Sequence, residues 1–149
     1  MLRLVCLSVF ALLLLTACGG NDLDQLIHSK LLTEIEKCEG CDLAGTELSG
    51  ANLTRANLTG VDLSGVDLNG SNLKEANLDR AKLNRANLTR VDLTGAYLKN
   101  ADLNEADLSG AYLNRANLTE ANMKNIRNLD SAIKCKTIFS WGEDNSGCE

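Results

Sequence analysis

The sequence predicts an all-β solenoid, and the spacing of its leucines carries that prediction. Leucine recurs every five residues from Leu43 through Leu118, sixteen times in succession, and Met123 fills the next position. Five residues turn an α-helix by about 500°, so these leucines would spiral around a helix and form no stripe. In a flat strand they would alternate between opposite faces. A corner in every unit removes both conflicts, because each Leu then returns to a common interior.

The other positions of the five-residue unit fit this interpretation. A small or β-branched residue stands two before each Leu, as at Ala51 and Val61, and the residue directly before Leu is mostly Asp or Asn. Glycine often closes the unit, as at Gly60, and suits a corner because its backbone angles are permissive. Other units carry a charged residue there: Arg55, Arg85, Arg90 and Glu105. We therefore expect that a left-handed conformation is not compulsory at the corner.

The repeat resembles the pentapeptide-repeat family, whose consensus is A(D/N)LXX. Ala51-Asn52-Leu53-Thr54-Arg55 and Ala106-Asp107-Leu108-Ser109-Gly110 both match it, and the match covers residues 41–125 without a gap in seventeen units. The resemblance implies a right-handed quadrilateral β-helix with four repeats per coil. It also implies that the residue before each Leu points outward.

The repeat pattern changes after residue 125, and residues 126–149 are assigned to a C-terminal cap. Three apolar residues fall at interior positions of the continued frame: Ile126, Ile133 and Ile138. The coil is therefore expected to extend to about residue 140. Asn128 stands where Leu is expected, and we interpret it as the start of irregular closure, with Leu129 turning inward after a slip of one residue.

Residues 23–40 are predicted to hold a short N-terminal capping helix followed by a CxxC motif. Five apolar residues recur at helical spacing: Leu23, Leu26, Ile27, Leu31 and Ile35. Asp22 or Asp24 is placed to cap the start of this helix. We expect its apolar face to cover the first coil, because a solenoid otherwise exposes unpaired strand edges. The alternative is a helix lying on the membrane, but its polar face is acidic and unsuited to anionic lipid.

The first seventeen residues are predicted to be a signal peptide. Arg3 precedes an apolar run from Leu4 to Leu15, which is too short for a permanent membrane span. Leu15-Thr16-Ala17-Cys18 resembles the lipobox of bacterial lipoproteins. That resemblance implies that Cys18 becomes the lipidated N-terminus, followed by a short linker over residues 18–22. The alternative is an ordinary signal peptide with an incidental cysteine.

This interpretation gives the chain an extracytoplasmic, lipid-anchored location, and the lipid makes the membrane one of its partners. Several acyl chains suffice for stable anchoring, because each buried CH₂ contributes about 0.8 kcal/mol. In Gram-negative lipoproteins an Asp directly after the lipidated Cys marks retention in the inner membrane. Gly19 occupies that place here, so the outer membrane is favoured if the cell is Gram-negative.

Cysteine usage agrees with export. With Cys6 in the signal peptide and Cys18 lipidated, four cysteines remain: Cys38, Cys41, Cys135 and Cys148. An even number in an exported chain indicates two disulfides. One candidate pairing, Cys135 with Cys148, closes a loop of about 14 residues, a constraint of roughly 3 kcal/mol. Two alternatives are a redox CxxC at Cys38 and Cys41, and a four-cysteine zinc site, which the distance between the two pairs disfavours.

Nothing in the sequence supports an enzyme, and no cofactor or metal is expected. The single histidine, His28, lies in the predicted cap helix, and the glycines occur singly at the repeat period, which excludes a phosphate-binding loop. The formal net charge of -5 argues against a nucleic-acid partner. Assigning every fourth unit to one side gives sides with net charges from -2 to +2, so none carries the acidic stripe that quinolone-resistance members of the family use to mimic DNA for gyrase.

Two aromatic residues interrupt the outward Asp or Asn positions. Tyr97 and Tyr112 are expected on adjacent sides about one corner apart, with Arg115 and Lys99 nearby. They mark a possible contact surface, although Tyr also packs well along a strand face without any partner. The sequence therefore predicts a non-catalytic structural or protein-interaction module of the bacterial envelope. The alternatives are an envelope redox enzyme that uses Cys38 and Cys41, and a DNA-mimicking gyrase binder. The sequence specifies no oligomeric state.

Overall fold

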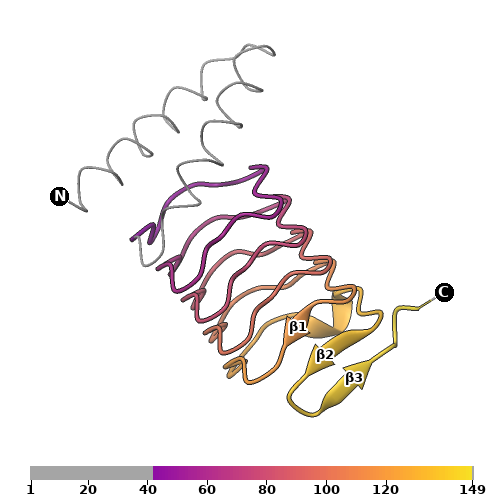
Figure 1. Ribbon diagram of the computed structural model, residues 1–149. Helices are drawn as coiled ribbons and strands as arrows, with labels where there is room; N and C mark the ends of the chain where they lie inside the picture. The colour runs from indigo at the N-terminus through magenta and orange to yellow at the C-terminus, as the bar shows by residue number, and fades with distance from the viewer. Residues whose placement is uncertain (1–41, 149) are drawn as a thin grey trace.

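The computed structural model describes residues 42–148, which form one continuous coil (Figure 1). Through most of the coil, each outward residue pairs in parallel with the residue 20 positions later, as Asp42 does with Asp62. Twenty residues are four pentapeptides, so each turn of the coil has four sides, and the quadrilateral β-helix is confirmed. Several predictions fall outside the described residues: the predicted signal peptide 1–17, the predicted linker 18–22, the predicted capping helix and CxxC motif of 23–40, and the candidate residues Cys18, Cys38 and Cys41.

Four ladders of parallel bridges define the four faces of the solenoid. The first face carries Asp42, Asp62, Lys82, Asp102 and Asn122, and the second carries Glu47, Asp67, Asn87, Asp107 and Arg127. The third carries Asn52, Asn72, Asp92, Tyr112 and Ile133, and the fourth carries Asn57, Asn77, Tyr97, Asn117 and Ile138. Successive rungs of a ladder are separated by about 4.8 Å, the usual strand spacing.

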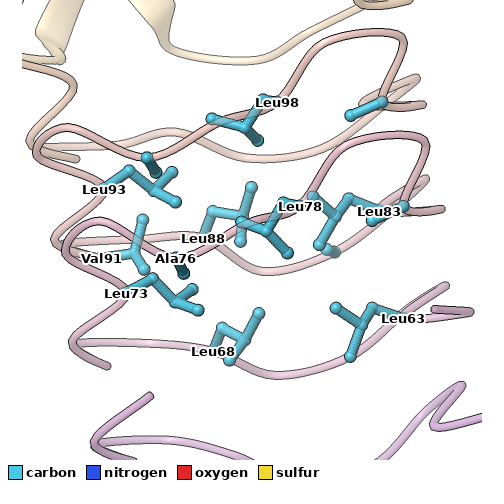
Figure 2. Packing of buried hydrophobic residues seen from close by; sticks show 14 of the residues in the cluster. Leu63, Leu68, Leu73, Ala76, Leu78, Leu83, Leu88, Val91, Leu93 and Leu98 are labelled. Carbon is cyan, nitrogen blue, oxygen red and sulfur yellow. The ribbon is translucent and has the colours of Figure 1, made fainter. Parts of the chain in front are cut away.

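The leucines fill the interior, as the sequence predicts. Every repeat leucine from Leu43 to Leu118 is at most 4% exposed, and the Ala or Val two residues before it is buried beside it in most units (Figure 2). Leucine therefore packs on leucine from coil to coil, with Ala76 and Val91 filling the space between them (Figure 2). Polar residues at the small position are satisfied locally, since Ser71 Oγ donates to the carbonyl of Leu68 at 2.8 Å.

The corner of every described repeat through Asn125 has a left-handed backbone, and the expectation that this conformation is optional is wrong. Glycines there have φ from 61° to 69°, and charged residues share the conformation, as in Arg85 at 60°. Each corner is a β-turn in which the amide three residues after Leu donates back to the Leu carbonyl, as from Ala56 to Leu53 at 3.1 Å. Positive φ at the third position is what a type II turn requires. The turn geometry therefore overrides the preference of Arg and Glu for negative φ.

The side chain of the outward Asp or Asn makes a further hydrogen bond to the same turn. In thirteen repeats its Oδ1 accepts the backbone amide two residues later, as Asn87 does from Thr89 at 3.2 Å. Many Thr and Ser hydroxyls donate to the same oxygen, for example Thr89 Oγ1 to Asn87 at 2.6 Å. The D/N consensus is thus a local hydrogen-bonding requirement of the turn.

One extra residue enters the coil after Arg127. Asn128 has left-handed backbone angles and precedes the short 3-10 helix η1, Leu129–Ser131. Beyond it the bridges join residues 21 apart, Tyr112 to Ile133 and Asn117 to Ile138. The slip of one residue turns Leu129 toward the core, where it is half-buried.

The slip also reverses two expectations for the last coil. Ile126, before the slip, packs partly against the core, but Ile133 and Ile138 are 38% and 42% exposed and do not take the predicted interior positions. Shifting a strand pattern by one residue moves every side chain to the opposite face. The inward places go instead to three buried residues in the last coil: Lys134, Thr137 and Phe139. Lys134 Nζ donates to the carbonyl of Leu129 at 2.9 Å, so this buried ammonium has an acceptor.

A small three-stranded sheet ends the solenoid on the fourth face (Figure 1). Strand β1, Asn117–Leu118, pairs in parallel with β2, Thr137–Phe139, and β2 pairs antiparallel with β3, Gly142–Asp144. Strand β3 thereby covers the edge of β2 that a further coil would use. The Trp141 ring stacks on Phe139, a buried member of the core, with ring centroids 4.6 Å apart.

The first prediction tests the leucine interior. Leu88→Ala removes a fully buried side chain from the middle of the stack. The free energy of unfolding should fall by about 2–5 kcal/mol, because stacked coils cannot collapse around the cavity. Lys99→Ala, a truncation on the exposed surface of the same rod, is the matched control and should change it by less than about 0.5 kcal/mol. Equal effects of the two variants in urea unfolding would contradict the stacked core.

The second prediction tests the left-handed corner at two neighbouring rungs of one corner. Gly60→Ala should destabilise by roughly 1–2 kcal/mol, since φ is +66° and no atom lies within 4 Å of the added Cβ. Arg80→Gly, at φ 60°, should stabilise by up to about 1 kcal/mol, because the relief of strain exceeds the added flexibility of the unfolded chain. The midpoints of urea unfolding should move in opposite directions, and a shift in the same direction would sink the assignment.

Candidate functional site

Four exposed apolar side chains gather on the third and fourth faces of the last coils. Tyr112 and its ladder neighbour Ile133 stand on the third face, 43% and 38% exposed. Tyr97 and Ile138 stand on the fourth face, 54% and 42% exposed, with Asn117 on the rung between them. Trp141 is the other exposed large apolar side chain among residues 42–148, and it sits at the end of the rod. We call Tyr97, Tyr112, Ile133 and Ile138 the apolar patch.

Both tyrosines replace a residue that the local turn uses. The Asp or Asn at their position accepts an amide hydrogen bond in thirteen repeats, and a Tyr ring cannot do so at that distance. At Tyr97 the amide of Lys99 is accepted instead by Asp79 Oδ1 of the preceding coil, at 2.8 Å. At Tyr112 the side-chain acceptor is lost, a cost of about 1 kcal/mol for a typical hydrogen bond. The tyrosines are therefore not explained by turn stability.

Two cations occupy the corner between the third and fourth faces. Arg115 closes the unit that begins after Gly110, and Lys136, with φ 55°, is the corner residue of the next coil. Their coils are joined by the bond from the Arg115 amide to the Cys135 carbonyl at 2.8 Å. Neither side chain is in an ion pair with any residue of 42–148. The cationic corner therefore lies between the two halves of the apolar patch.

Five ion pairs join charged side chains on neighbouring coils within residues 42–148. Arg55 binds Glu75 at 2.7 Å, and Arg85 binds Glu105 at 2.9 Å, in each case along one corner. The remaining pairs join Lys74 to Asp92, Lys82 to Asp62 and Arg127 to Asp107. Arg115 and Lys136 are thus a third pair of charged corner residues on adjacent coils, and they differ from the other two pairs in carrying charges of the same sign.

Hydrogen bonds also hold several carboxylates in their charged form. A hydrogen bond from Asn128 and a second from Ser109 lower the pKa of Asp107, and the hydroxyl of Ser64 and the ammonium of Lys82 lower the pKa of Asp62. The hydrogen bond and charge of Arg85 lower the pKa of Glu105. These acids are therefore structural elements of the rod, committed to turns and to neighbouring coils.

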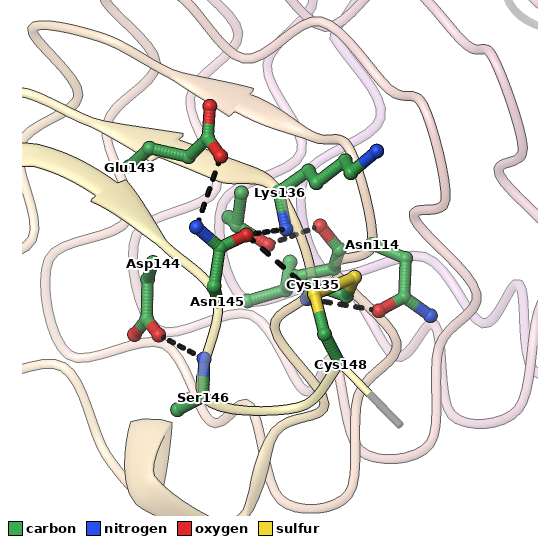
Figure 3. Close-up of a disulfide and its surroundings, with 10 residues drawn as sticks. Asn114, Cys135, Lys136, Glu143, Asp144, Asn145, Ser146 and Cys148 are labelled. Atoms are coloured by element: carbon green, nitrogen blue, oxygen red, sulfur yellow. Dashed lines mark hydrogen bonds between the residues drawn. A yellow bond between two sulfur atoms is a disulfide. The ribbon is translucent and has the colours of Figure 1, made fainter.

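The structure brings two of the four candidate cysteines together. Cys135 and Cys148 form a disulfide, with their Cα atoms 4.7 Å apart, which ties the chain after β3 to the last coil (Figure 3). The Asn145 side chain accepts the Lys136 amide at 3.0 Å beside it, and Asn114 Oδ1 accepts the Cys135 amide at 3.0 Å. The disulfide therefore fixes the backbone directly beneath the Arg115–Lys136 corner.

Between residues 42 and 148, no three His, Cys, Asp or Glu side chains are grouped so that they could hold a metal ion. Over the same range, no helix has the length and hydropathy needed to cross a membrane. No polar side-chain atom buried in this part of the chain lacks a hydrogen-bond partner.

Sequence reasoning singled out Tyr97, Tyr112 and Arg115. It missed Ile133 and Ile138 as surface residues, and it missed Lys136 as the neighbour of Arg115. The frame without the slip assigns both isoleucines to the interior and places Lys136 off this corner. Asn128 was the available signal, because an Asn at a Leu position announces the slip. Applying the slip to the whole segment 129–139, and not to Leu129 alone, would have moved the isoleucines outward.

Comparison with known proteins agrees with this architecture. The family model described as pentapeptide repeats, in 8 copies, matches residues 37–70, 71–110 and 96–127. No curated protein matches the chain.

Two solved structures resemble the chain closely enough to compare. HetL, a pentapeptide repeat protein involved in heterocyst differentiation regulation in the cyanobacterium Nostoc sp. strain PCC 7120, is 37% identical with a TM-score of 0.66. The alignment covers 70% of this chain and 49% of HetL, so the chain spans about half of HetL's length. A pentapeptide repeat protein from the thylakoid lumen of Arabidopsis thaliana is 28% identical with a TM-score of 0.59, over 62% of this chain and 64% of that one.

The plasmid-mediated fluoroquinolone resistance protein QnrB1 is more distant, at 16% identity and a TM-score of 0.40 over 66% of this chain and 65% of its own. That likeness carries no functional argument. The five-residue leucine period, the four-sided coil, the left-handed corners and the family match together establish that the chain belongs to the pentapeptide-repeat family and has its right-handed β-helix fold.

Proposed function

We propose that the chain is a non-catalytic protein-interaction module, held at the bacterial envelope by lipid on Cys18. The apolar patch carries the first half of this proposal. Four large apolar side chains stand exposed on two adjoining faces where every other rung is Asn or Asp. Exposed clusters of this kind mark contact surfaces, and Tyr and Arg are the residues most enriched where binding energy concentrates.

A rigid scaffold makes the patch a usable binding surface. Its four side chains stand on strands whose backbone bonds run from coil to coil, for example Tyr112 to Val91 at 2.9 Å and Leu113 to Ile133 at 2.8 Å. Because the rungs are fixed on both sides, little backbone order has to be gained on binding. Family resemblance supports the same class of function, since pentapeptide-repeat proteins generally mediate protein interactions.

The envelope address is the second half of the proposal and rests on the sequence. The apolar run before Leu15-Thr16-Ala17-Cys18 has the length of a signal peptide, and the lipobox resemblance supplies the anchor. The Cys135–Cys148 disulfide supports an extracytoplasmic location, because disulfides persist in oxidising compartments. If the cell is Gram-negative, Gly19 favours the outer membrane.

The two alternative functions have less support. A redox role would use Cys38 and Cys41, which lie outside the described residues, and no thioredoxin-like βαβ pattern surrounds them in the sequence. DNA mimicry requires unpaired acids in a dense stripe. Cross-coil ion pairs occupy Asp62, Glu75 and Asp92 with cations, as they do Glu105 and Asp107.

The third prediction tests the interaction surface in cells. A photocrosslinking amino acid placed at Tyr97 or Tyr112 should yield the same crosslinked protein, because both positions border one patch. Asn52 is the matched control, since it lies on the third face like Tyr112 and is exposed in the first described coil. Adducts should be resolved by gel shift and mass spectrometry. Identical adducts from all three positions, or none from the tyrosines, would refute the surface.

The fourth prediction tests the anchor. Cys18→Ala should abolish incorporation of labelled palmitate and release the protein from the membrane fraction, because the thiol that accepts the lipid is gone. Cys6→Ala, within the predicted signal peptide, is the matched control and should leave both readouts unchanged. Unaltered membrane association of Cys18→Ala would mean that the chain is not a lipoprotein, whatever the crosslinking shows.

A further inference from the structure

We propose that the patch and its cationic corner bind an extended, acidic and apolar segment of a partner protein. This inference rests on the proposed interaction function and adds the chemistry of the partner. The two cations, Arg115 and Lys136, contribute carboxylate recognition, and the four apolar side chains contribute contact area on either side.

The first argument is that two like charges are neighbours at this corner. Neighbouring corner residues of opposite charge form ion pairs on this rod, at Arg55 with Glu75 and at Arg85 with Glu105. Arg115 and Lys136 occupy the equivalent relation with charges of the same sign. Like charges on adjacent rungs repel, so this pair is unfavourable for the isolated rod. An anionic group placed between them removes the repulsion.

The second argument is the surroundings of the two cations. Gly95 occupies the corner one coil before Arg115, with only the Glu75 side chain, at 3.5 Å, near the place of a Cβ. The corner position next to Arg115 therefore has no side chain of its own. The exposed rings of Tyr97 and Tyr112 stand on the two faces that flank this corner. The Lys136 side chain extends away from Glu143, whose carboxylate accepts a hydrogen bond from Asn145 Nδ2 at 3.0 Å (Figure 3). The Glu143 carboxylate of strand β3 therefore already has a hydrogen-bond partner.

The third argument concerns the two faces that meet at this corner. A segment crossing the corner would touch Tyr112 and Ile133 on one side and Tyr97 and Ile138 on the other. Arg binds carboxylates through a planar fork of donors, and Lys adds a second, compact charge. A segment with carboxylates flanked by apolar residues therefore fits this surface, because its carboxylates would meet the two cations at the corner and its apolar residues would meet the patch on either side.

Other occupants fit the surface less well. A second copy docked through the same patch would place Arg115 and Lys136 against the same two cations, which a two-fold interface cannot avoid near its axis. An anionic membrane or a nucleic acid presents many negative charges at once, so a chain with a formal net charge of -5 repels it more strongly than it repels a short segment with two or three carboxylates.

The fifth prediction tests this chemistry with a defined probe. A displayed library of random dodecapeptides is selected against the mature, lipid-free chain, made by exporting the Cys18→Ala form and checked for correct folding by circular dichroism. The enriched peptides should carry two or more Asp or Glu residues next to apolar residues. The combined charge reversal Arg115→Glu with Lys136→Glu should weaken their binding at least about tenfold, and raising the salt concentration should weaken binding to the unsubstituted chain.

Two further variants separate binding from folding. Arg80→Glu with Arg90→Glu reverses two corner cations outside the patch and should leave binding within about twofold. Tyr112→Asn restores the acceptor that the turn uses elsewhere, so it should unfold at an equal or higher temperature while binding falls. A Tyr112→Asn variant that binds peptides as well as the unsubstituted chain would overturn the assignment.

The remaining outcomes distinguish this inference from the proposed function. Enriched peptides without acids, or peptides whose binding survives the charge reversal at Arg115 and Lys136, overturn the acidic partner and leave the interaction surface standing. Binding of phosphatidylglycerol vesicles through the same residues, with no peptide enriched, overturns the inference in favour of a lipid surface. Absence of any adduct from Tyr97 and Tyr112 in cells refutes the interaction function itself.

Discussion

The left-handed corner is the constraint on which the rest of the structure depends. Because the chain reverses into positive φ at each fifth residue, every leucine from Leu43 to Leu118 returns to the same interior and stacks on the leucine one coil away. The stack needs no large rings, which explains how a chain with 3% aromatic residues builds a continuous core. Glycine is the least costly residue at the corner, yet Arg, Glu and Asn hold the same geometry, so the packing of the coils overrides the local preference of the residue.

Much of this fold could be predicted from the sequence, since a strict period constrains both the number of sides and the direction of each side chain. The parts that escaped prediction depend on registration between coils. A single inserted residue at Asn128 turned Ile133 and Ile138 outward and brought Lys134 inward, against the hydrophobic preference of all three. Hydrophobicity alone cannot show such a slip, because the last coil follows the hydrogen-bond ladder of the coil before it.

The candidate site was likewise predictable where it departs from the repeat pattern and not where it depends on registration between coils. Tyr97 and Tyr112 were visible because they break the Asp or Asn pattern, and Arg115 because it lies three residues after Tyr112. The partnership of Arg115 with Lys136 was not visible, because it arises only when the slip brings residues 21 apart into adjacent rungs. The disulfide between Cys135 and Cys148 then holds that final coil in place, so the residues that complete the surface are fixed by the same segment that ends the rod.

The hydrogen bond that the outward Asp or Asn accepts in thirteen repeats affects how such a rod can change during evolution. The side chain at each outward position makes hydrogen bonds to its own turn or to the adjacent coil and does not contact the leucine core, so Tyr97 and Tyr112 can replace Asp or Asn without changing that core. A substitution there changes one surface position. These positions are arranged on four faces, with successive rungs of a face about 4.8 Å apart. The binding surface can therefore change one position at a time, at a cost of one to three hydrogen bonds per substitution, while the leucine stack and the corners stay unchanged.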